Sequence, residues 1–137
     1  MWLVLGLALA LLRRSPRPFA LVLLVDAAAE GIADALKAIV GSRRPQGYDP
    51  LVALPHSPAF PSGHATVSFA CATVLSALEP RAAPFFVLLA AAIAYSRLYV
   101  GVHWPLDVVA GAAIGVATAL LLLGAVRRGS GGRLLRG

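Results

Sequence analysis

The chain has 137 residues, of which 59% are hydrophobic and 13% are charged, and its mean hydropathy is +0.82. This composition is too apolar for a soluble domain of this size, and the length excludes several domains. A net charge of +6 would favour a nucleic-acid partner in a soluble protein. Most of the arginines, however, lie at the ends of apolar segments, which is typical of membrane topology. We therefore expect one integral membrane domain that binds no nucleic acid.

Five apolar segments are predicted to form the helices of one all-α transmembrane bundle. A helix needs about 20 apolar residues to cross a bilayer, and four of the segments come close to that length. The first segment, residues 1–12, is too short, and we expect it to be the tail of a span whose beginning is missing. A signal peptide is less favoured, because Arg13 and Arg14 stand where a cleavage site needs small residues. The four longer segments cover residues 18–40, 62–78, 82–100 and 104–126.

The arginines between and after these segments predict the orientation. If five helices cross the membrane in alternating directions, one group of arginines lies entirely in the cytoplasm. It contains the arginines of residues 13–17, Arg81 and the arginines of the last eleven residues. The connections 41–61 and 97–103 then lie on the outer face of the cell membrane, together with the amino terminus. The first of them is rich in proline, so it cannot be helical and is either a partial lid or a plain connector. We expect a single domain over residues 1–128 and a disordered basic tail over 129–137.

Three short polar clusters interrupt the apolar segments, all on the predicted outer face. The first contains Lys37, the only lysine of the chain, and Arg44 followed by Pro45. The second is the sequence Pro-Ser-Gly-His at 61–64, directly before a predicted helix. Exposed backbone N–H groups and the positive end of the helix dipole favour an anion at such a position. Taken alone, this signal is weak, because Ser62 could simply cap the helix.

The third cluster contains Ser96 and Arg97, followed by His103 and Asp107. The last two residues are four apart at the start of the last predicted helix, so we expect their side chains to share one face. A carboxylate there can accept a hydrogen bond from one ring nitrogen and leave the other nitrogen as a nucleophile. The pair could also be half of a metal site, but two histidines and one aspartate without a further ligand make this alternative less favoured.

Lys37, Arg44 and Arg97 together form a candidate clamp for a phosphoryl group. A planar guanidinium donates two parallel hydrogen bonds to such a group, and an ammonium adds a compact charge. Each cation alone could be a residue that snorkels from a helix end to the membrane interface. Their occurrence on one membrane face favours anion binding.

The three clusters closely resemble the signature of the type 2 phosphatidic acid phosphatase superfamily, over about residues 30–120 and in the same order and spacing. The resemblance implies a membrane phosphatase without a metal or other cofactor. It also implies that His103 attacks phosphorus, that His64 protonates the leaving oxygen and that Asp107 orients His103. Membrane members of this family typically have about six helices, so this chain looks one helix short at its amino end. The resemblance assigns the phosphate oxygens to Lys37, Arg44, Ser62, Gly63 and Arg97.

We interpret the chain as a phosphatase of lipid phosphate monoesters or diphosphates whose lipid tail enters from the bilayer. Phosphatidic acid, phosphatidylglycerol phosphate and polyprenyl phosphates or diphosphates all remain open as substrates, and the oligomeric state is not indicated. A vanadate-dependent haloperoxidase shares the anion site by resemblance, but those enzymes are larger and soluble. A non-catalytic scaffold or transporter would explain the helices but not the polar groups gathered on one face.

Other polar and small residues have a structural and a functional interpretation. Asp26, Glu30 and Asp34 fall on one face of the second segment, where ionisable groups at membrane depth are costly. They are either structural partners of buried cations or part of the electrostatics of the site, and the structural interpretation is favoured. Gly111 and Gly115 form a face of small residues that predicts close helix packing.

Overall fold

The structure is a computed structural model that describes residues 1–45, 51–53 and 55–129, and the described chain is entirely helical and loop, without strands. This confirms the all-α part of the predicted fold class. Each apolar segment forms a helix whose bounds differ from the prediction by at most three residues. The predicted tail lies outside the described residues, except for Gly129 at the end of the last helix. The helices are α1 Trp2–Leu12, α2 Arg17–Val40, α3 Gly63–Leu78, α4 Ala83–Tyr99 and α5 Pro105–Gly129, with a 3-10 turn at Pro80–Ala82.

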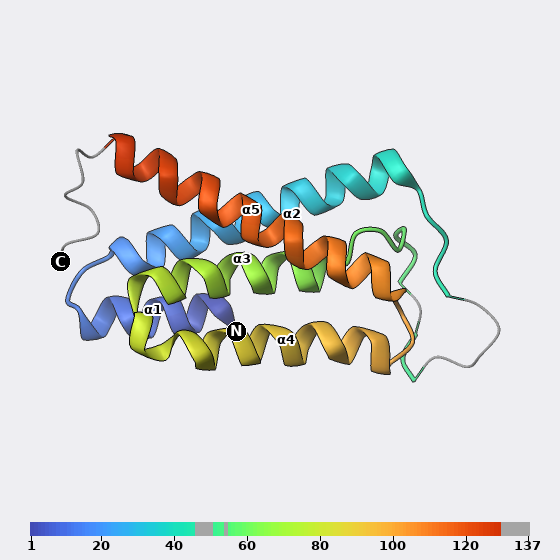
Figure 1. Ribbon diagram of the computed structural model, residues 1–137, viewed down its shortest axis with the longest axis horizontal. Coiled ribbons are helices and arrows are strands. Elements are labelled where there is room, and N and C mark those ends of the chain that lie inside the picture. The colour runs from blue at the N-terminus through green and yellow to red at the C-terminus, as the bar shows by residue number, and fades with distance from the viewer. Residues whose placement is uncertain (46–50, 54, 130–137) are drawn as a thin grey trace.

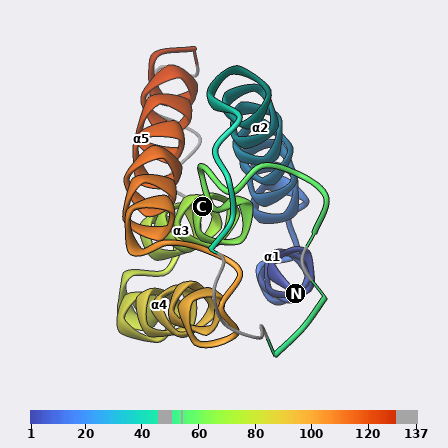
Figure 2. The ribbon, with the colours of Figure 1, turned by 90° about the vertical axis from the view of Figure 1, so that its right-hand side faces the viewer.

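Helix α3 lies at the centre of the bundle and contacts each of the other four α-helices (Figure 2). The described parts of the connection between α2 and α3 lie together with residues 100–104 at one end, which we call the proline end (Figure 1). The connections of residues 13–16 and 79–82 lie at the opposite end with the end of α5, and we call this the arginine end. Helix α1 covers only the half of the bundle near the arginine end.

The prediction of about five crossings is not confirmed. Within the described residues, only Pro80–Tyr99 and Pro105–Gly129 are long and apolar enough to cross a membrane by themselves. Helices α1 and α3 have 11 and 16 residues, which at 1.5 Å per residue give about 16 and about 24 Å against a hydrocarbon core of about 30 Å. Helix α2 has 24 residues, but it carries three carboxylates and Lys37. Hydropathy alone marks each of these segments as apolar. It does not reveal that α3 is a short central helix in contact with the other four α-helices.

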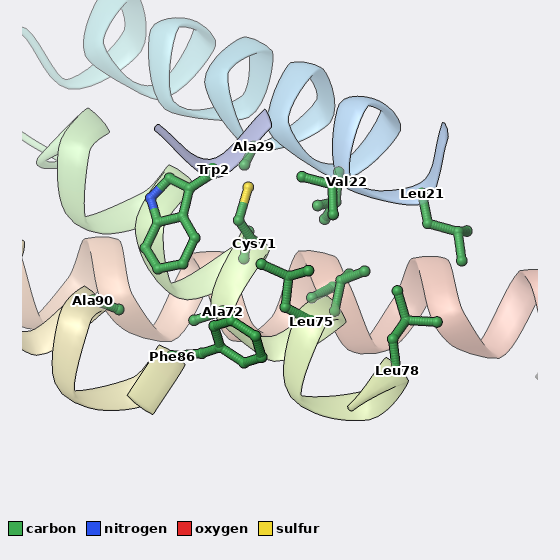
Figure 3. Close-up of a cluster of buried hydrophobic side chains, with 14 of the residues drawn as sticks. Trp2, Leu21, Val22, Ala29, Cys71, Ala72, Leu75, Leu78, Phe86 and Ala90 are labelled. Atoms are coloured by element: carbon green, nitrogen blue, oxygen red, sulfur yellow. The ribbon is translucent and has the colours of Figure 1, made fainter. Parts of the chain in front are cut away.

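The core is formed where α3 meets α2 and α4 (Figure 3). Leu75 and Cys71 of α3 are fully buried against Val22 and Val25 of α2. Large side chains such as Leu121 of α5, which is 75% exposed, point outward instead. Because lipid is as apolar as leucine, van der Waals packing rather than burial from water holds such helices together, and small residues allow the close approach. The buried small residues include Ala29, Ala33, Ala70, Ala72, Ala90 and Ala119.

Glycines bring the backbone of α5 against that of α3, as the sequence predicts. A Cβ atom on Gly111 would lie 2.7 Å from the carbonyl oxygen of Ser62, and one on Gly115 would collide with the carbonyl oxygen of Thr66. The Ser62 N–H donates a 3.0 Å hydrogen bond to the carbonyl oxygen of Asp107 across the same contact. The first turns of the two helices are therefore fixed side by side at the proline end.

We predict that Gly115→Ala destabilises the protein, because the added methyl group overlaps backbone atoms of Thr66 and Ala70 that cannot rotate away. Overpacking of this kind typically costs about 1–3 kcal/mol. The measurement is the thermal midpoint of the detergent-purified protein. Gly124→Ala is the matched control, because nothing lies within 4 Å of its added Cβ and alanine favours the helix. A midpoint for Gly115→Ala equal to or above that of Gly124→Ala would contradict the packing argument.

Candidate active site

A cavity of ≈ 610 Å³ brings six of the eight predicted site residues together. It lies among α2, α3, α4 and the two connections of the proline end, and it continues along α2 to the start of α1. The other two predicted residues, Ser62 and Asp107, are buried behind its wall, with exposures of 0% and 4%. The site residues that line the cavity are Lys37, Arg44, Gly63, His64, Arg97 and His103.

Lys37 enters the site from the last turn of α2. The helix ends at Gly41, whose φ of 59° is left-handed and whose N–H donates to the carbonyl oxygen of Lys37 at 3.0 Å. The Lys37 ammonium contacts Asp34 Oδ1 at 2.8 Å. It also lies beside the start of α3, because a Cβ atom on Gly63 would be 3.2 Å from Lys37 Nζ. A side chain at position 63 would make a close contact with this ammonium, and glycine avoids that contact.

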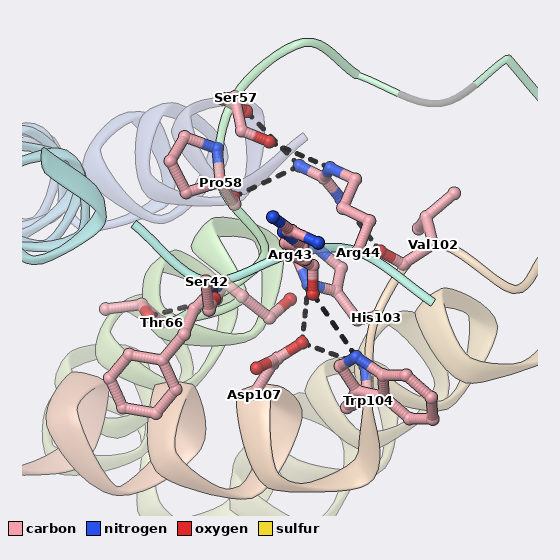
Figure 4. A network of polar contacts seen from close by, with 12 residues as sticks. Ser42, Arg43, Arg44, Ser57, Pro58, Thr66, Val102, His103, Trp104 and Asp107 are labelled. Atoms are coloured by element: carbon pink, nitrogen blue, oxygen red, sulfur yellow. Dashed lines mark hydrogen bonds and ion pairs between the residues drawn. The ribbon is translucent and has the colours of Figure 1, made fainter. Parts of the chain in front are cut away.

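Arg44 makes four hydrogen bonds to the protein at the edge of the cavity (Figure 4). Its Nε and Nη1 donate to the carbonyl oxygens of Ser57 and Val102 at 2.9 and 2.8 Å. Its Nη2 donates to the Ser57 hydroxyl and to the carbonyl oxygen of Pro58 at 3.2 and 3.4 Å. Arg44 thus ties the loop before α3 to the turn before α5. The sequence signature does not show these partners, which leave few guanidinium N–H groups for a phosphate.

The loop that the sequence suggests as a lid forms part of the cavity wall where it is described. Pro55 and Ser57 line the cavity. The N–H groups of Ala59 and Phe60 donate to the carbonyl and hydroxyl oxygens of Ser42 at 3.0 and 2.7 Å. Residues 46–50 and 54 of the expected lid lie outside the described residues. The second half of the loop is therefore held against its beginning, next to the site.

His103 and Asp107 lie together, but not in the way the sequence predicts. Helix α5 begins at Pro105, so His103 belongs to the turn before the helix rather than to its first face. Asp107 Oδ2 accepts a 2.8 Å hydrogen bond from the N–H of Trp104 and lies 3.5 Å from His103 Nδ1. Asp107 is the third residue of α5, and its carboxylate accepts from the N–H of the residue directly before the helix, as in a capping box. At 3.5 Å the carboxylate is close to the ring without forming a hydrogen bond, and His103 Nδ1 has no hydrogen-bond partner among the described residues.

The surroundings of His103 favour its neutral form. Burial lowers the pKa of the imidazole, and the Arg44 guanidinium lowers it further. The Asp107 carboxylate and the backbone of Ala59 oppose this shift without reversing it. A pKa below the usual value leaves the ring uncharged at neutral pH, which is the form that has a nitrogen lone pair for attack.

The start of α3 forms the part of the site next to Lys37. Ser62 precedes the helix in an extended conformation, but its hydroxyl makes no capping bond. The hydroxyl oxygen is buried and unpartnered among the described residues. Ser62 therefore occupies the N-cap position without a capping bond from its side chain, and its N–H already donates to the carbonyl oxygen of Asp107. Gly63 and His64 follow in the first turn and line the cavity.

Arg97 completes the cationic wall from the last turn of α4. Its Nε and Nη2 both donate to the Ser96 hydroxyl at 3.1 Å, and that hydroxyl donates to the carbonyl oxygen of Ile93 at 2.7 Å. Ser96 thus fixes the guanidinium at the end of the helix. Within the described residues, no group of His, Cys, Asp and Glu side chains is arranged to hold a metal ion. The positive charge of the cavity comes from side chains, which suits a phosphoryl group.

We predict that Arg44→Lys loosens the loop before α3, because a lysine cannot make the four forked contacts of the guanidinium. The hydrogen-bonded backbone N–H groups of Ala59 and Phe60 should exchange with deuterated solvent roughly tenfold faster, the effect of losing one charge-assisted hydrogen bond. Hydrogen–deuterium exchange of the detergent-purified protein measures this rate. Arg43→Lys is the matched control, because the Arg43 side chain is exposed. Equal exchange in the two variants would show that Arg44 does not hold the loop.

Known proteins show the same sequence pattern over most of the chain. The family model of the PAP2 superfamily matches residues 16–129. The chain is 32% identical over 130 residues to the bacitracin transport permease protein BcrC of Bacillus licheniformis, a match that covers 88% of this chain and 63% of that protein. It is 34% identical over 127 residues to the decaprenylphosphoryl-5-phosphoribose phosphatase of Mycobacterium tuberculosis, which covers 88% of this chain and 69% of the phosphatase.

The fold is also similar to a solved membrane protein. The crystal structure of a transmembrane PAP2 type phosphatidylglycerolphosphate phosphatase from Bacillus subtilis matches with a TM-score of 0.70 and 26% identity. The match covers 93% of this chain and 67% of that chain. Sequence family and fold agree over the helices that carry the cavity, and the chain therefore belongs to the PAP2 superfamily.

Proposed function

We propose that the chain is an integral membrane phosphatase that hydrolyses lipid phosphate monoesters or diphosphates through a phosphohistidine intermediate. The observation that carries this proposal is the shared cavity of three cations and two imidazoles, with a buried carboxylate behind one imidazole. Such a set of residues can hold a phosphoryl group and transfer it through a histidine. The substrate phosphate would lie between the start of α3 and the turn before α5.

In the first step, His103 Nε2 attacks phosphorus while the bond from phosphorus to the lipid oxygen breaks. Asp107 near Nδ1 holds the ring and stabilises the charge that it gains. His64 donates a proton to the leaving oxygen, so the lipid departs as an alcohol or, from a diphosphate, as a monophosphate. Lys37, Arg97 and the one remaining N–H group of Arg44 balance the charge on the phosphoryl oxygens, and Gly63 allows close approach.

In the second step, water attacks the phosphohistidine. His64, now neutral, takes a proton from the water as the bond from phosphorus to His103 breaks, and inorganic phosphate leaves. Neither step in this scheme requires a metal, because the cationic side chains supply the positive charge that a metal would otherwise bring.

The names of the relatives favour an envelope lipid as the substrate. Besides the decaprenyl-linked phosphatase and the phosphatidylglycerolphosphate phosphatase, the chain is 43% identical over 58 residues to an undecaprenyl-diphosphatase of Sulfolobus acidocaldarius, a match that covers 42% of this chain and 28% of that protein. The cavity has room for a head group next to the phosphate, and it reaches apolar residues such as Val67 and Ile93. The lipid tail would follow these residues toward the bilayer.

The two histidines should be separable by the leaving group of the substrate. A nucleophile is needed for every substrate, whereas a general acid matters most when the leaving oxygen is basic. We predict that His103→Ala abolishes turnover of a lipid phosphate and of an activated aryl phosphate alike, and leaves no acid-labile phosphoenzyme. His64→Ala should slow the lipid phosphate by roughly 10²–10⁴-fold and the aryl ester distinctly less. Phosphate release is measured in detergent with a strong chelator present.

The opposite pattern would contradict these roles. Substantial activity in His103→Ala, together with loss of both activities in His64→Ala, would exchange the nucleophile and the acid. Loss of wild-type activity in the chelator, restored by a divalent ion, would show that the reaction uses a metal.

A transporter is the competing function, because one relative is named a transport permease. A binding site for transport needs the cations but not a nucleophile backed by a carboxylate, as His103 is by Asp107. The two functions separate in the assay above, since a transporter releases no inorganic phosphate in detergent.

We propose that the cavity opens on the outer face of the cell membrane. The arginine end carries a dense group of cations, as the positive-inside rule requires of a cytoplasmic face. Exposed Tyr99 and Trp104 lie at the proline end, where aromatic side chains suit the other interface. The described arginines of the arginine end are Arg13, Arg14, Arg17, Arg81, Arg127 and Arg128.

Cysteine labelling in intact cells tests this orientation. Gly47 and Ser130 lie outside the described residues, so we choose the exposed residues His56 and Gly129 as probes. We predict that His56→Cys reacts with a membrane-impermeant thiol reagent and that Gly129→Cys reacts only after the cells are opened. The wild-type protein is the control, because its Cys71 is buried. The reverse labelling would place the cavity on the cytoplasmic face.

A further inference from the structure

The carboxylate of Asp34 lies on the ammonium of Lys37 within the cavity. Asp34 Oδ1 and Lys37 Nζ are 2.8 Å apart, on adjacent turns of α2. The aspartate side chain is 64% exposed, whereas the lysine side chain is only 17% exposed. Both residues line the cavity. The ion pair therefore joins a partly buried cation of the site to an exposed carboxylate outside the family signature.

The position of the ammonium explains why it needs a negative partner. Lys37 Nζ lies next to Gly63, at the first residue of α3, where the helix presents the positive end of its dipole. Arg97 adds a second positive charge to the same cavity. An ammonium here is repelled unless an anion lies close to it. Without substrate, Asp34 is that anion among the described residues.

The free N–H groups of Lys37 make this contact compatible with phosphate binding. An ammonium donates three hydrogen bonds in different directions, and Asp34 takes one of them. The lysine side chain is long and flexible, and from the last turn of α2 it could also extend toward the membrane interface. A fixed contact with Asp34 selects the conformation that points at Gly63.

We propose that Asp34 is a positioning residue that holds Lys37 beside the phosphate subsite in the empty and the loaded enzyme. This inference rests on the proposed function, in which Lys37 binds the phosphoryl oxygens. The proposal gives Asp34 a role that Glu30 does not have, although Glu30 lies one turn earlier on the same helix and lines the same cavity. Glu30 makes no ion pair within the described part of the chain.

The single lysine of the chain allows a test that does not depend on activity. The contact with Asp34 holds the Lys37 side chain at 17% exposure, which limits the access of an amine-directed reagent to the nitrogen. Asp34→Asn should therefore increase the labelling rate of Lys37 roughly two- to fivefold, the range for a partly exposed ion pair. Mass spectrometry of the peptide with Lys37 separates this signal from the amino terminus. Glu30→Gln is the matched control and should leave the rate unchanged.

Kinetics then test whether Asp34 acts through Lys37. Asp34→Asn should lower kcat/KM for a lipid phosphate roughly two- to fivefold, and Glu30→Gln should leave turnover per folded molecule unchanged. In a double-mutant cycle, Lys37→Met combined with Asp34→Asn should be no slower than Lys37→Met alone. A merely structural role of Asp34 would lower the activity of both backgrounds.

Three results would overturn the proposal. An unchanged labelling rate in Asp34→Asn would show that the carboxylate does not hold Lys37. Losses that multiply in the cycle would show that Asp34 acts independently of Lys37. An increase of kcat/KM in Asp34→Asn would show that the carboxylate competes with phosphate instead of positioning the lysine. Absence of phosphatase activity in the wild type would refute the proposed function instead, and the labelling rates would still decide the contact.

Discussion

The close approach of α5 to α3 is the constraint on which the site depends. Gly111 and Gly115 remove the side chains that would keep the two backbones apart, and the hydrogen bond from the Ser62 N–H to Asp107 fixes the register at one end. His103 precedes α5 and His64 opens α3, so this register brings both imidazoles to one cavity. In a bundle surrounded by lipid, such geometry depends on close packing rather than on hydrophobic burial.

Charge is arranged along the cavity in a definite order. The cations and imidazoles lie at the proline end, and the carboxylates Asp34, Glu30 and Asp26 follow along α2 toward the start of α1. A phosphate in the cavity is attracted to the first group, which lies at the proline end. Asp34 stands at the boundary of the two groups, and its contact with Lys37 keeps one cation on the phosphate side.

The sequence predicts the helices and the gathering of the site residues well, because both follow from local patterns. Apolar segments of helical length are visible without tertiary information. When neighbouring helices alternate in direction, polar clusters at alternate helix ends lie at the same end of the bundle. The number of crossings was not predictable in this way, because α3 is short and central and α2 is charged. The turn before α5 also differs, since Pro105 begins the helix two residues after His103.

The partners of Arg44 show the limit of reading a site from motif residues. Its hydrogen bonds go to the hydroxyl of Ser57 and to three backbone carbonyl oxygens, and no sequence pattern marks a carbonyl oxygen as a partner. A phosphate that binds Arg44 must use the one remaining N–H group or replace some of these acceptors. In the second case, phosphate binding would break hydrogen bonds that Arg44 makes to Ser57. Phosphate and Ser57 would then compete for the same guanidinium. Arg44 also donates to the carbonyl oxygen of Val102, the residue directly before His103. A change in the hydrogen bonds of Arg44 would therefore act on the neighbour of the proposed nucleophile.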